Sequence, residues 1–328
     1  MSEMRKDIFS DEWVVFASNR KDKPYNYKHN KNKIEENCNK ICPFCPGNES
    51  MTTPTLYELK NEKGWDIRVF ENMYPAVSLT DCENKNDGFY ESLGGKGIHE
   101  IVVDTPEHKM DTSDENDEHF VKLFKVLGKR LELMMKNENV EYVQIFKNNG
   151  PFAGASITHS HWQIMSIPVM AHEQEMALKA YSEYKEKNGR CLMCDIIEHE
   201  RKEKSRMVFE NNEFSVFTPY AARQSYELWI VPKRHISTIN ELTEEEMISL
   251  AGVLKDMIGR VNNIMHNISF NICIQETPKS APKGLFHWYI RILPRLGSWA
   301  GFEFATRCFI NPVVPEFAAE FYRKQGEK

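Results

Sequence analysis

Short apolar runs in the first half of the chain predict β-strands, and one longer run predicts an amphipathic helix. Residues 114–136 carry apolar side chains at helical spacing, and Ser113 or Asp114 is the predicted N-cap of that helix. The strands are predicted where β-branched and other apolar residues are concentrated, over residues 66–71, 99–104, 140–146 and 159–168.

The second half of the chain repeats this order of elements. Its apolar spacing predicts a helix over residues 244–266, with Thr243 as the N-cap. Strands are predicted over residues 207–210, 213–218, 226–231, 269–275 and 286–293. In each half a polar loop separates the last two strands, and the last strand has a histidine near its start.

The repetition extends to residues that can bind metal. Each half opens with a Cys-x-x-Cys pair and has a proline shortly before a histidine that precedes its helix. These residues are Cys42, Cys45 and His108 in the first half, and Cys191, Cys194 and His235 in the second. We therefore predict an α+β fold with a duplicated unit, each copy an antiparallel sheet with a helix packed on it. The Glu- and Lys-rich segment 171–188 is the predicted helical connector, which divides the chain into units 1–188 and 189–328.

Composition narrows the class of protein. The chain has 328 residues, of which 41% are hydrophobic, enough to bury one large core or two ordinary ones. Its net charge is -6, and it lacks the basic clusters that nucleic-acid duplexes require, so we expect no nucleic-acid partner. It also lacks a signal-peptide segment and any run near the roughly 18 apolar residues of a membrane span. We expect a soluble, cytoplasmic protein without a membrane partner.

The two cysteine pairs predict two zinc sites. In a chain without a secretion signal such pairs favour metal over disulfides, and each pair supplies half of a tetrahedral shell from one tight turn. The candidates for the remaining ligands are His108 and His159 in the first site, and His235 and His287 in the second. The alternative is that the cysteines are core or redox residues and the histidines have no metal.

The chemically most specific segment is NNGPFAGASITHSHWQ, residues 148–163. It joins a loop of small residues to the alternating polar side chains of His159, His161 and Gln163, which a strand would place on one face. A neutral imidazole such as that of His161 can attack an activated phosphorus, and Gln163 can donate a hydrogen bond to a phosphate oxygen. In the loop, Asn148, Gly154 and Ser156 are candidate substrate contacts.

Two other interpretations of this segment stay open. It could be a structural His/Gln cluster, or a His-x-His pair that only binds metal. The histidines outside the predicted sites, His99 among them, are expected on the surface or in helices.

The segment resembles the active-site motif Gly-x-Ser-x-x-His-Pro-His-x-Gln of the galactose-1-phosphate uridylyltransferase family, within the histidine-triad superfamily. This chain reads GASITHSHWQ over residues 154–163, with Ser160 in place of the proline. The resemblance covers nearly the whole chain. Segments 11–24, 42–47, 69–76 and 301–303 are similar to the family's N-terminal strand with its basic pair, zinc knuckle, nucleotide-contacting segment and sugar site.

The resemblance implies a mechanism and a zinc cofactor. His161 would attack the α-phosphate of a nucleotide sugar, release the sugar 1-phosphate and pass the nucleotidyl group to a sugar phosphate or to phosphate. Gln163 would steady the covalent intermediate, and the zinc of the first half would be structural. The implied binding residues are Ser156, Arg20 and Lys23 for phosphates, Asn72 for the nucleoside and Glu303 for sugar hydroxyls. Because family members are often dimers, a homodimer is expected.

The resemblance leaves two substrate assignments. The first is transfer of UMP between UDP-glucose and galactose 1-phosphate, in galactose metabolism. The second is phosphorolysis of ADP-glucose, because Ser160, the segment 71–75 and residues 286–289 look closer to the ADP-glucose phosphorylase branch, in which the second half carries its own zinc. A nucleotide hydrolase of the superfamily and a zinc-stabilised nucleotide-binding protein without turnover are the remaining alternatives.

An ungapped alignment of the last strands bears on the second half. It pairs residues 161–168 with 287–294, so His287 falls opposite His161, and Tyr289 falls opposite Gln163. The second half has no His-x-His pair, and we therefore expect a single chemical centre, in the first half.

Overall fold

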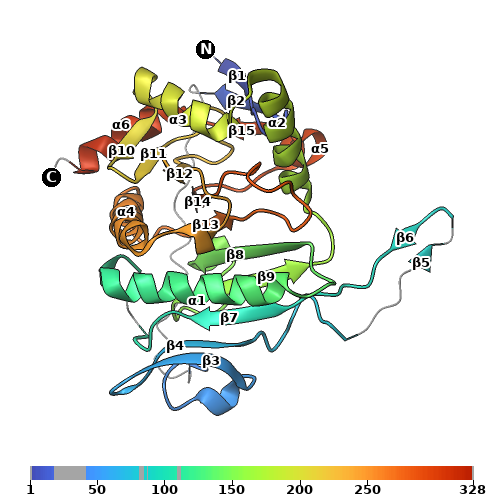
Figure 1. Ribbon diagram of the computed structural model, residues 1–328. Coiled ribbons are helices and arrows are strands. Elements are labelled where there is room, and N and C mark those ends of the chain that lie inside the picture. Colours follow the sequence, from blue (N-terminus) through green and yellow to red (C-terminus); the bar gives the residue numbers. More distant parts are fainter. Residues whose placement is uncertain (1, 18–41, 81–84, 87, 109–111, 327–328) are drawn as a thin grey trace.

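The computed structural model describes residues 2–17, 42–80, 85–86, 88–108 and 112–326 (Figure 1). Its helices are α1 (Asp117–Met135), α2 (His172–Asn188), α3 (Leu192–Glu203), α4 (Glu244–Asn262), α5 (Gly301–Thr306) and α6 (Pro315–Gly326). The strands of its largest sheet are β3 (Thr55–Asn61), β4 (Gly64–Glu71), β7 (His99–Val103), β8 (Tyr142–Asn149), β9 (His161–Ile167), β10 (Met207–Glu210), β11 (Phe214–Phe217), β12 (Leu228–Pro232), β13 (Phe270–Gln275) and β14 (Tyr289–Pro294). A small sheet contains β1 (Ser2–Lys6), β2 (Trp13–Ala17) and β15 (Phe309–Asn311), and a hairpin contains β5 (Lys85–Asn86) and β6 (Glu91–Ser92).

One ten-stranded antiparallel sheet runs through both halves of the chain. Its strand order is β10-β11-β12-β14-β13-β8-β9-β7-β4-β3, so first-half strands lie on one side of the β8–β13 pair and second-half strands on the other (Figure 1). At this seam Ile145 of β8 lies opposite Ile274 of β13. The predicted α+β fold with antiparallel sheets and packed helices is confirmed, and the sheets of the two halves are continuous.

Helices α1 and α4 lie side by side on one face of this sheet (Figure 1). Phe124 and Leu127 of α1 and Leu254 of α4 belong to the same buried cluster as Ile164 of β9 and Ile290 of β14. A single apolar core therefore extends from the first half into the second, which is the expected result of amphipathic helices covering an alternating sheet face.

The two long helices begin at side-chain caps. Thr243 accepts a hydrogen bond from the N–H of Glu246, whose carboxylate accepts one from the N–H of Thr243, so the predicted cap of α4 is confirmed. The predicted cap of α1, Ser113 or Asp114, is wrong. Residues 112–114 form a separate 3-10 turn, and Asn116 caps the helix by accepting a hydrogen bond from the N–H of His119.

The opposite face of the sheet is covered differently in the two halves. In the second half, Tyr181 of α2 and Phe9 pack with Trp229 and Tyr289. In the first half, the turn that contains Cys42 and Cys45 contributes Phe44 to a smaller cluster with Phe70 and Val103.

The predicted connector over residues 171–188 is helix α2, which ends at Gly189 with a φ of 69°. The division of the chain into units 1–188 and 189–328 at this point stays a prediction. Three helices were not predicted from the sequence: α3, which begins directly after Cys191, and α5 and α6 near the C-terminus. None of the described helices has the length and apolar character needed to cross a bilayer.

Candidate active site and metal clusters

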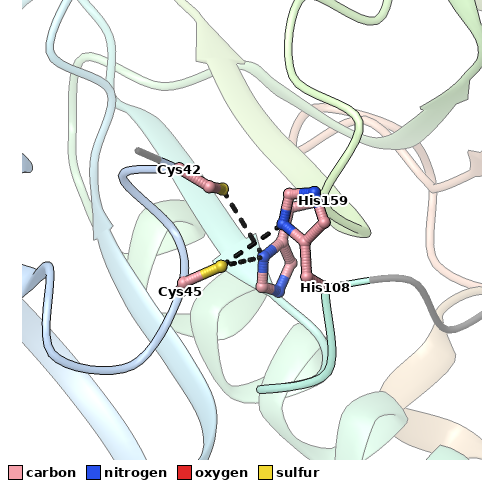
Figure 2. Close-up of side chains that lie close together, drawn as sticks. All are labelled: Cys42, Cys45, His108 and His159. Carbon is pink, nitrogen blue, oxygen red and sulfur yellow. Dashed lines mark hydrogen bonds between the residues drawn. The ribbon is translucent and has the colours of Figure 1, made fainter. Parts of the chain in front are cut away.

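Four side chains of the first half meet in one cluster, as Figure 2 shows. Cys42 and Cys45 come from one turn, His108 follows β7, and His159 precedes β9. The Sγ of Cys45 lies 3.3 Å from Nδ1 of His108 and 3.6 Å from Nδ1 of His159. The Sγ of Cys42 lies 3.7 Å from the same nitrogen of His159. The structure thus brings together all four residues of the predicted first site.

The spacing of these atoms fits a tetrahedral zinc ion. All four possible ligand atoms lie within 4.8 Å of one another. Bonds of about 2.3 Å to sulfur and 2.0–2.1 Å to nitrogen place S and N roughly 3.6 Å apart in a tetrahedron. In addition, Nε2 of His159 lies 2.8 Å from the carbonyl oxygen of Thr105 and donates to it, which directs the Nδ1 lone pair at the sulfurs. The donor set is therefore compatible with zinc.

The second predicted site is assembled in the same way. Nδ1 of His287 lies 3.7 Å from the Sγ of Cys191 and 3.5 Å from the Sγ of Cys194. Nδ1 of His235 lies 3.8 Å from the Sγ of Cys194. The outer nitrogen of His287, Nε2, is 2.9 Å from the carbonyl oxygen of Pro232, which again leaves the Nδ1 lone pair for a metal.

His161 is the first residue of β9 and follows His159 of the first cluster by two positions in the chain. Its Nδ1 donates to the carbonyl oxygen of His159 at 2.8 Å, and its ring lies edge-on to Phe44 with 5.2 Å between the centroids. The residue is 5% exposed. Burial lowers the pKa of His161 below its usual value, and the charge of Lys147 lowers it further, so the imidazole is neutral near pH 7.

Sequence reasoning expected the strand to begin at His159, and it begins two residues later. The last ladder partner of β9 on β7 is Val103, opposite His161, because the chain turns away after β7 to supply His108. His159 is therefore free of the ladder and directs its ring at the cysteines, whereas His161 and Gln163 remain alternate residues of the strand.

A buried ion pair supports the segment between the two histidines. Lys147, on β8, is 1% exposed, and its Nζ lies 2.8 Å from Oδ2 of Asp104 and 2.5 Å from Oγ of Ser160. Trp162 also donates its indole N–H to the Asp104 carboxylate. Burial alone would raise the pKa of Asp104, but the Lys147 ammonium outweighs it, so the pKa lies below its usual value. Sequence reasoning singled out neither Lys147 nor Asp104.

Gln163 forms a hydrogen bond with His99, a residue that was expected on the surface or in a helix. Nε2 of His99, on β7, lies 2.9 Å from Oε1 of Gln163. The amide nitrogen of Asn72 lies 3.3 Å from the same His99 nitrogen, and the N–H of Asn72 donates to the His99 carbonyl. The expectation that His99 is a surface or helix residue is wrong: it is a half-buried strand residue that joins the predicted nucleoside contact, Asn72, to Gln163.

The small-residue loop of the site is anchored by the second half of the chain. Asn271 of β13 donates to Oδ1 of Asn148 and to the carbonyl oxygen of Ala153, both at 2.8 Å. A Cβ at Gly150 would lie 2.4 Å from Oγ of Ser269, so the close approach requires glycine there. Gly154 ends the turn with a φ of 87°, and Gly154 and Ser156 are exposed, where a ligand can reach them.

The structure corrects the alignment of the two halves. β9 begins two residues after His159, and β14 begins at Tyr289, two residues after His287. The counterpart of His161 is therefore Tyr289 and not His287. The alignment is wrong by two residues, a shift that keeps every side chain on the same face of the strand and therefore leaves the apolar pattern unchanged.

The second-half counterparts have a different environment. Tyr289 is buried, and Arg291, the counterpart of Gln163, forms ion pairs with Glu227 at 3.0 Å and Glu173 at 3.1 Å. In the second half this face of the sheet is covered by α2 and Phe9. Glu173, on α2, also pairs with Arg223, at 2.6 Å.

Of three further predicted binding residues, the structure describes only Glu303, and its described contacts lie away from His161. Glu303 is on α5, where its carboxylate accepts a hydrogen bond from the N–H of Ala300, and α5 packs on β15 of the small sheet. None of the described contacts joins Glu303 to the site. Arg20 and Lys23 lie outside the described residues.

Comparison with family models matches both halves of the chain. Residues 1–171 match the N-terminal domain of galactose-1-phosphate uridyl transferase, and residues 175–291 match its C-terminal domain.

The similar proteins include enzymes with two different named activities. The chain is 32% identical to the ADP-glucose phosphorylase of Arabidopsis thaliana, over 98% of this chain and 92% of that protein. It is 29% identical to the galactose-1-phosphate uridylyltransferase of Thermotoga maritima, over 99% of this chain and 98% of the relative.

Solved structures agree with these relationships. The crystal structure of the ADP-glucose phosphorylase from Arabidopsis thaliana with bound ADP-glucose superimposes with a TM-score of 0.84, at 30% identity and 99% coverage of both chains. A uridylyltransferase structure superimposes with a TM-score of 0.77, at 30% identity, over 99% of this chain and 98% of the other. The superimposed folds and both matched domains agree, and the chain is an enzyme of the galactose-1-phosphate uridylyltransferase family.

Proposed function

We propose that this enzyme moves a nucleoside monophosphate from a nucleotide sugar to a phosphate-bearing acceptor through a covalent nucleotidyl intermediate on His161. The observation that carries the proposal is the hydrogen bond from Nδ1–H of His161 to the carbonyl oxygen of His159. It selects the neutral tautomer with its lone pair on Nε2, the atom that must attack phosphorus. Among the described residues, none is a hydrogen-bond partner of that Nε2.

The reaction has two balanced steps. In the first, Nε2 of His161 forms a bond to the α-phosphorus, the bond from that phosphorus to the bridging oxygen breaks, and the sugar 1-phosphate leaves with the electron pair. In the second, an acceptor oxygen attacks the same phosphorus, the N–P bond breaks, and Nε2 regains its lone pair. A sugar phosphate is a good leaving group, so no strong general acid is needed.

The other predicted residues have binding roles in this proposal. The amide N–H₂ of Gln163 donates to a non-bridging oxygen, where negative charge is concentrated. Ser156, Gly154 and Asn148 surround the phosphates from the exposed loop. Asn72 contacts the nucleoside, Arg20 and Lys23 contact phosphates, and Glu303 contacts sugar hydroxyls.

Zinc in this proposal is structural. The first cluster would hold it through Cys42, Cys45, His108 and His159, and the second through Cys191, Cys194, His235 and His287. When bound, the ion crosslinks segments far apart in the chain and keeps the cysteines as thiolates. A metal bound to His159 would hold the backbone of that residue in place. The carbonyl oxygen of His159 would then stay where Nδ1–H of His161 can donate to it.

ADP-glucose, with phosphate as the acceptor, is the first candidate donor. It is supported by the Arabidopsis ADP-glucose phosphorylase, which is 32% identical and whose structure with ADP-glucose superimposes with a TM-score of 0.84. UDP-glucose, with galactose 1-phosphate as the acceptor, is the second candidate donor, although the sequence alone favoured this prediction. It is supported by both domain models and by the Thermotoga maritima relative.

A labelling experiment tests the proposal. Purified protein is incubated with ADP-glucose or UDP-glucose, each labelled in the α-phosphate, and the adduct is located by peptide mass spectrometry. We expect one donor to label His161, and the acceptor that discharges the label identifies the second substrate. His161→Gly should abolish labelling and turnover while zinc content stays at the wild-type value. Turnover near wild type in that variant would show that the nucleophile is another residue.

A further inference from the structure

His99 and Gln163 lie on the same face of two neighbouring strands. In the β7–β9 ladder, Ile101 is opposite Gln163 and His99 is opposite Met165, so His99 is the diagonal neighbour of Gln163. The contact between Nε2 of His99 and Oε1 of Gln163, at 2.9 Å, follows from this register.

The main chain selects the tautomer of His99. The N–H of Ala76 points at Nδ1 of His99 at 3.3 Å, so Nδ1 must carry the lone pair. In the neutral ring the proton is then on Nε2, which can donate to Oε1 of Gln163. The opposite tautomer would lose both contacts, since it has a proton facing the Ala76 N–H and a lone pair facing a carbonyl oxygen. It would gain one contact, the longer one of 3.3 Å from the amide nitrogen of Asn72 to Nε2, so the balance of two contacts against one favours the proton on Nε2.

This hydrogen bond orients a side-chain amide that has two chemically opposite ends. A glutamine can present either its oxygen or its N–H₂ to a ligand, and only the N–H₂ end stabilises negative charge on phosphate. With its oxygen held by His99, Gln163 has only the N–H₂ group left for the substrate.

The same histidine is enclosed by the segment 72–76. The N–H of Asn72 donates to the His99 carbonyl at 2.8 Å, and Oδ1 of Asn72 accepts from the N–H of Tyr74, which leaves the amide N–H₂ of Asn72 near the His99 ring. Movement of this segment on nucleoside binding would therefore change the position of His99.

We propose that His99 is a positioning residue that fixes the orientation of the Gln163 amide and links the nucleoside segment 72–76 to the catalytic strand. The proposal rests on the proposed function, in which Gln163 donates to phosphate. His99 itself touches neither the phosphate nor His161.

Four variants test this: His99→Phe, His99→Gln, Gln163→Ala and the double variant His99→Phe with Gln163→Ala. Turnover is measured with the donor and acceptor that the labelling experiment identifies. Gln163→Ala should lower kcat roughly 100-fold, and His99→Phe roughly 10- to 100-fold, with a much smaller change in KM. The double variant should be no slower than Gln163→Ala, because His99 acts through Gln163. His99→Gln, whose amide again offers an acceptor and a donor, should recover part of kcat.

Controls separate this role from packing. Zinc content and the midpoint of thermal unfolding should stay at wild-type values in His99→Gln, and His172→Phe, which changes an exposed histidine at the start of α2, should leave kcat unchanged. If the losses of the two single variants multiply in the double variant, or if His99→Phe turns over like wild type while Gln163→Ala is slow, the inference is overturned. If Gln163→Ala itself is as fast as wild type, the role of Gln163 in the proposed function fails instead.

Discussion

His287 occupies the same place in the second Cys/His cluster that His159 occupies in the first. The Nδ1 of each ring lies 3.5–3.7 Å from two cysteine sulfurs, and the Nε2 of each lies 2.8–2.9 Å from a backbone carbonyl oxygen. The accepting residues, Thr105 and Pro232, each precede the other histidine of their cluster by three positions. The two clusters are thus repeated in their outer contacts as well as in their ligands.

We predict two zinc ions per chain, removable one at a time. Cys45→Ser and Cys194→Ser should each lower the zinc content from two to one, because each removes a thiolate from one cluster. Turnover should fall further in Cys45→Ser, since only the first cluster holds His159 and Phe44 against His161. Elemental analysis of purified protein measures the zinc. Cys308→Ser, at a cysteine outside both clusters, should retain both ions, and an unchanged zinc content in Cys194→Ser would contradict the second site.

Lys147→Met should destabilise the protein strongly. The substitution leaves the Asp104 carboxylate buried without its cation, which costs about 3–5 kcal/mol of unfolding free energy. Urea unfolding of the variant and the wild type measures this loss of unfolding free energy. Adding Asp104→Asn should restore part of the loss, because the remaining amide is neutral and can still accept from Trp162. A double variant less stable than Lys147→Met alone would show that the ion pair is not the cause.

Glu276 should make the stability depend on pH. Burial raises the pKa of this carboxyl, which accepts a hydrogen bond from Trp288, to about 7 in the folded protein. Between about pH 4.3 and 7 the folded state therefore binds a proton that the unfolded chain has released. The stabilisation is complete below that window and is lost as pH rises to about 7, at about 1.4 kcal/mol per unit of pKa difference.

Glu276→Gln should remove this slope and be more stable than wild type above pH 7. Unfolding free energies measured from pH 5 to 8 test the prediction. Glu138→Gln, at an exposed carboxylate, should keep the wild-type slope, and equal slopes in wild type and Glu276→Gln would refute the assignment.

Tyr289→Phe should turn over like wild type, whereas the matched change His161→Phe should abolish turnover. The two residues are counterparts in the repeated halves, but α2 and Phe9 cover Tyr289, so the second half has no access for a nucleotide there. Kinetic assays of the two variants decide it. A large loss of kcat in Tyr289→Phe, with an unchanged unfolding midpoint, would indicate that the second half takes part in the chemistry.

The sequence predicts much of this arrangement because the repeated motifs are local. The Cys-x-x-Cys turns, the alternation of His161 with Gln163 and the cap of Thr243 are each visible within a few residues. The ligand histidines could be named because the same order occurs twice, and the structure brings both sets together.

The contacts that could not be predicted from the sequence depend on strand register. His99 and Gln163 are 64 residues apart, and Lys147 and Asp104 are 43 apart, so only the β7–β9 and β8–β9 pairings bring them together. The alignment of His287 was likewise displaced by two residues, because a shift of two leaves every side chain on the same face and does not disturb the apolar pattern.

The hydrogen-bonded seam between β8 and β13 limits what can be done with fragments of this chain. Dividing the chain at Gly189 would expose two long strand edges. Each edge would present a row of peptide groups without hydrogen-bond partners, next to the exposed half of the apolar core. Either fragment, produced alone, would tend to aggregate rather than serve as a working miniature of the enzyme.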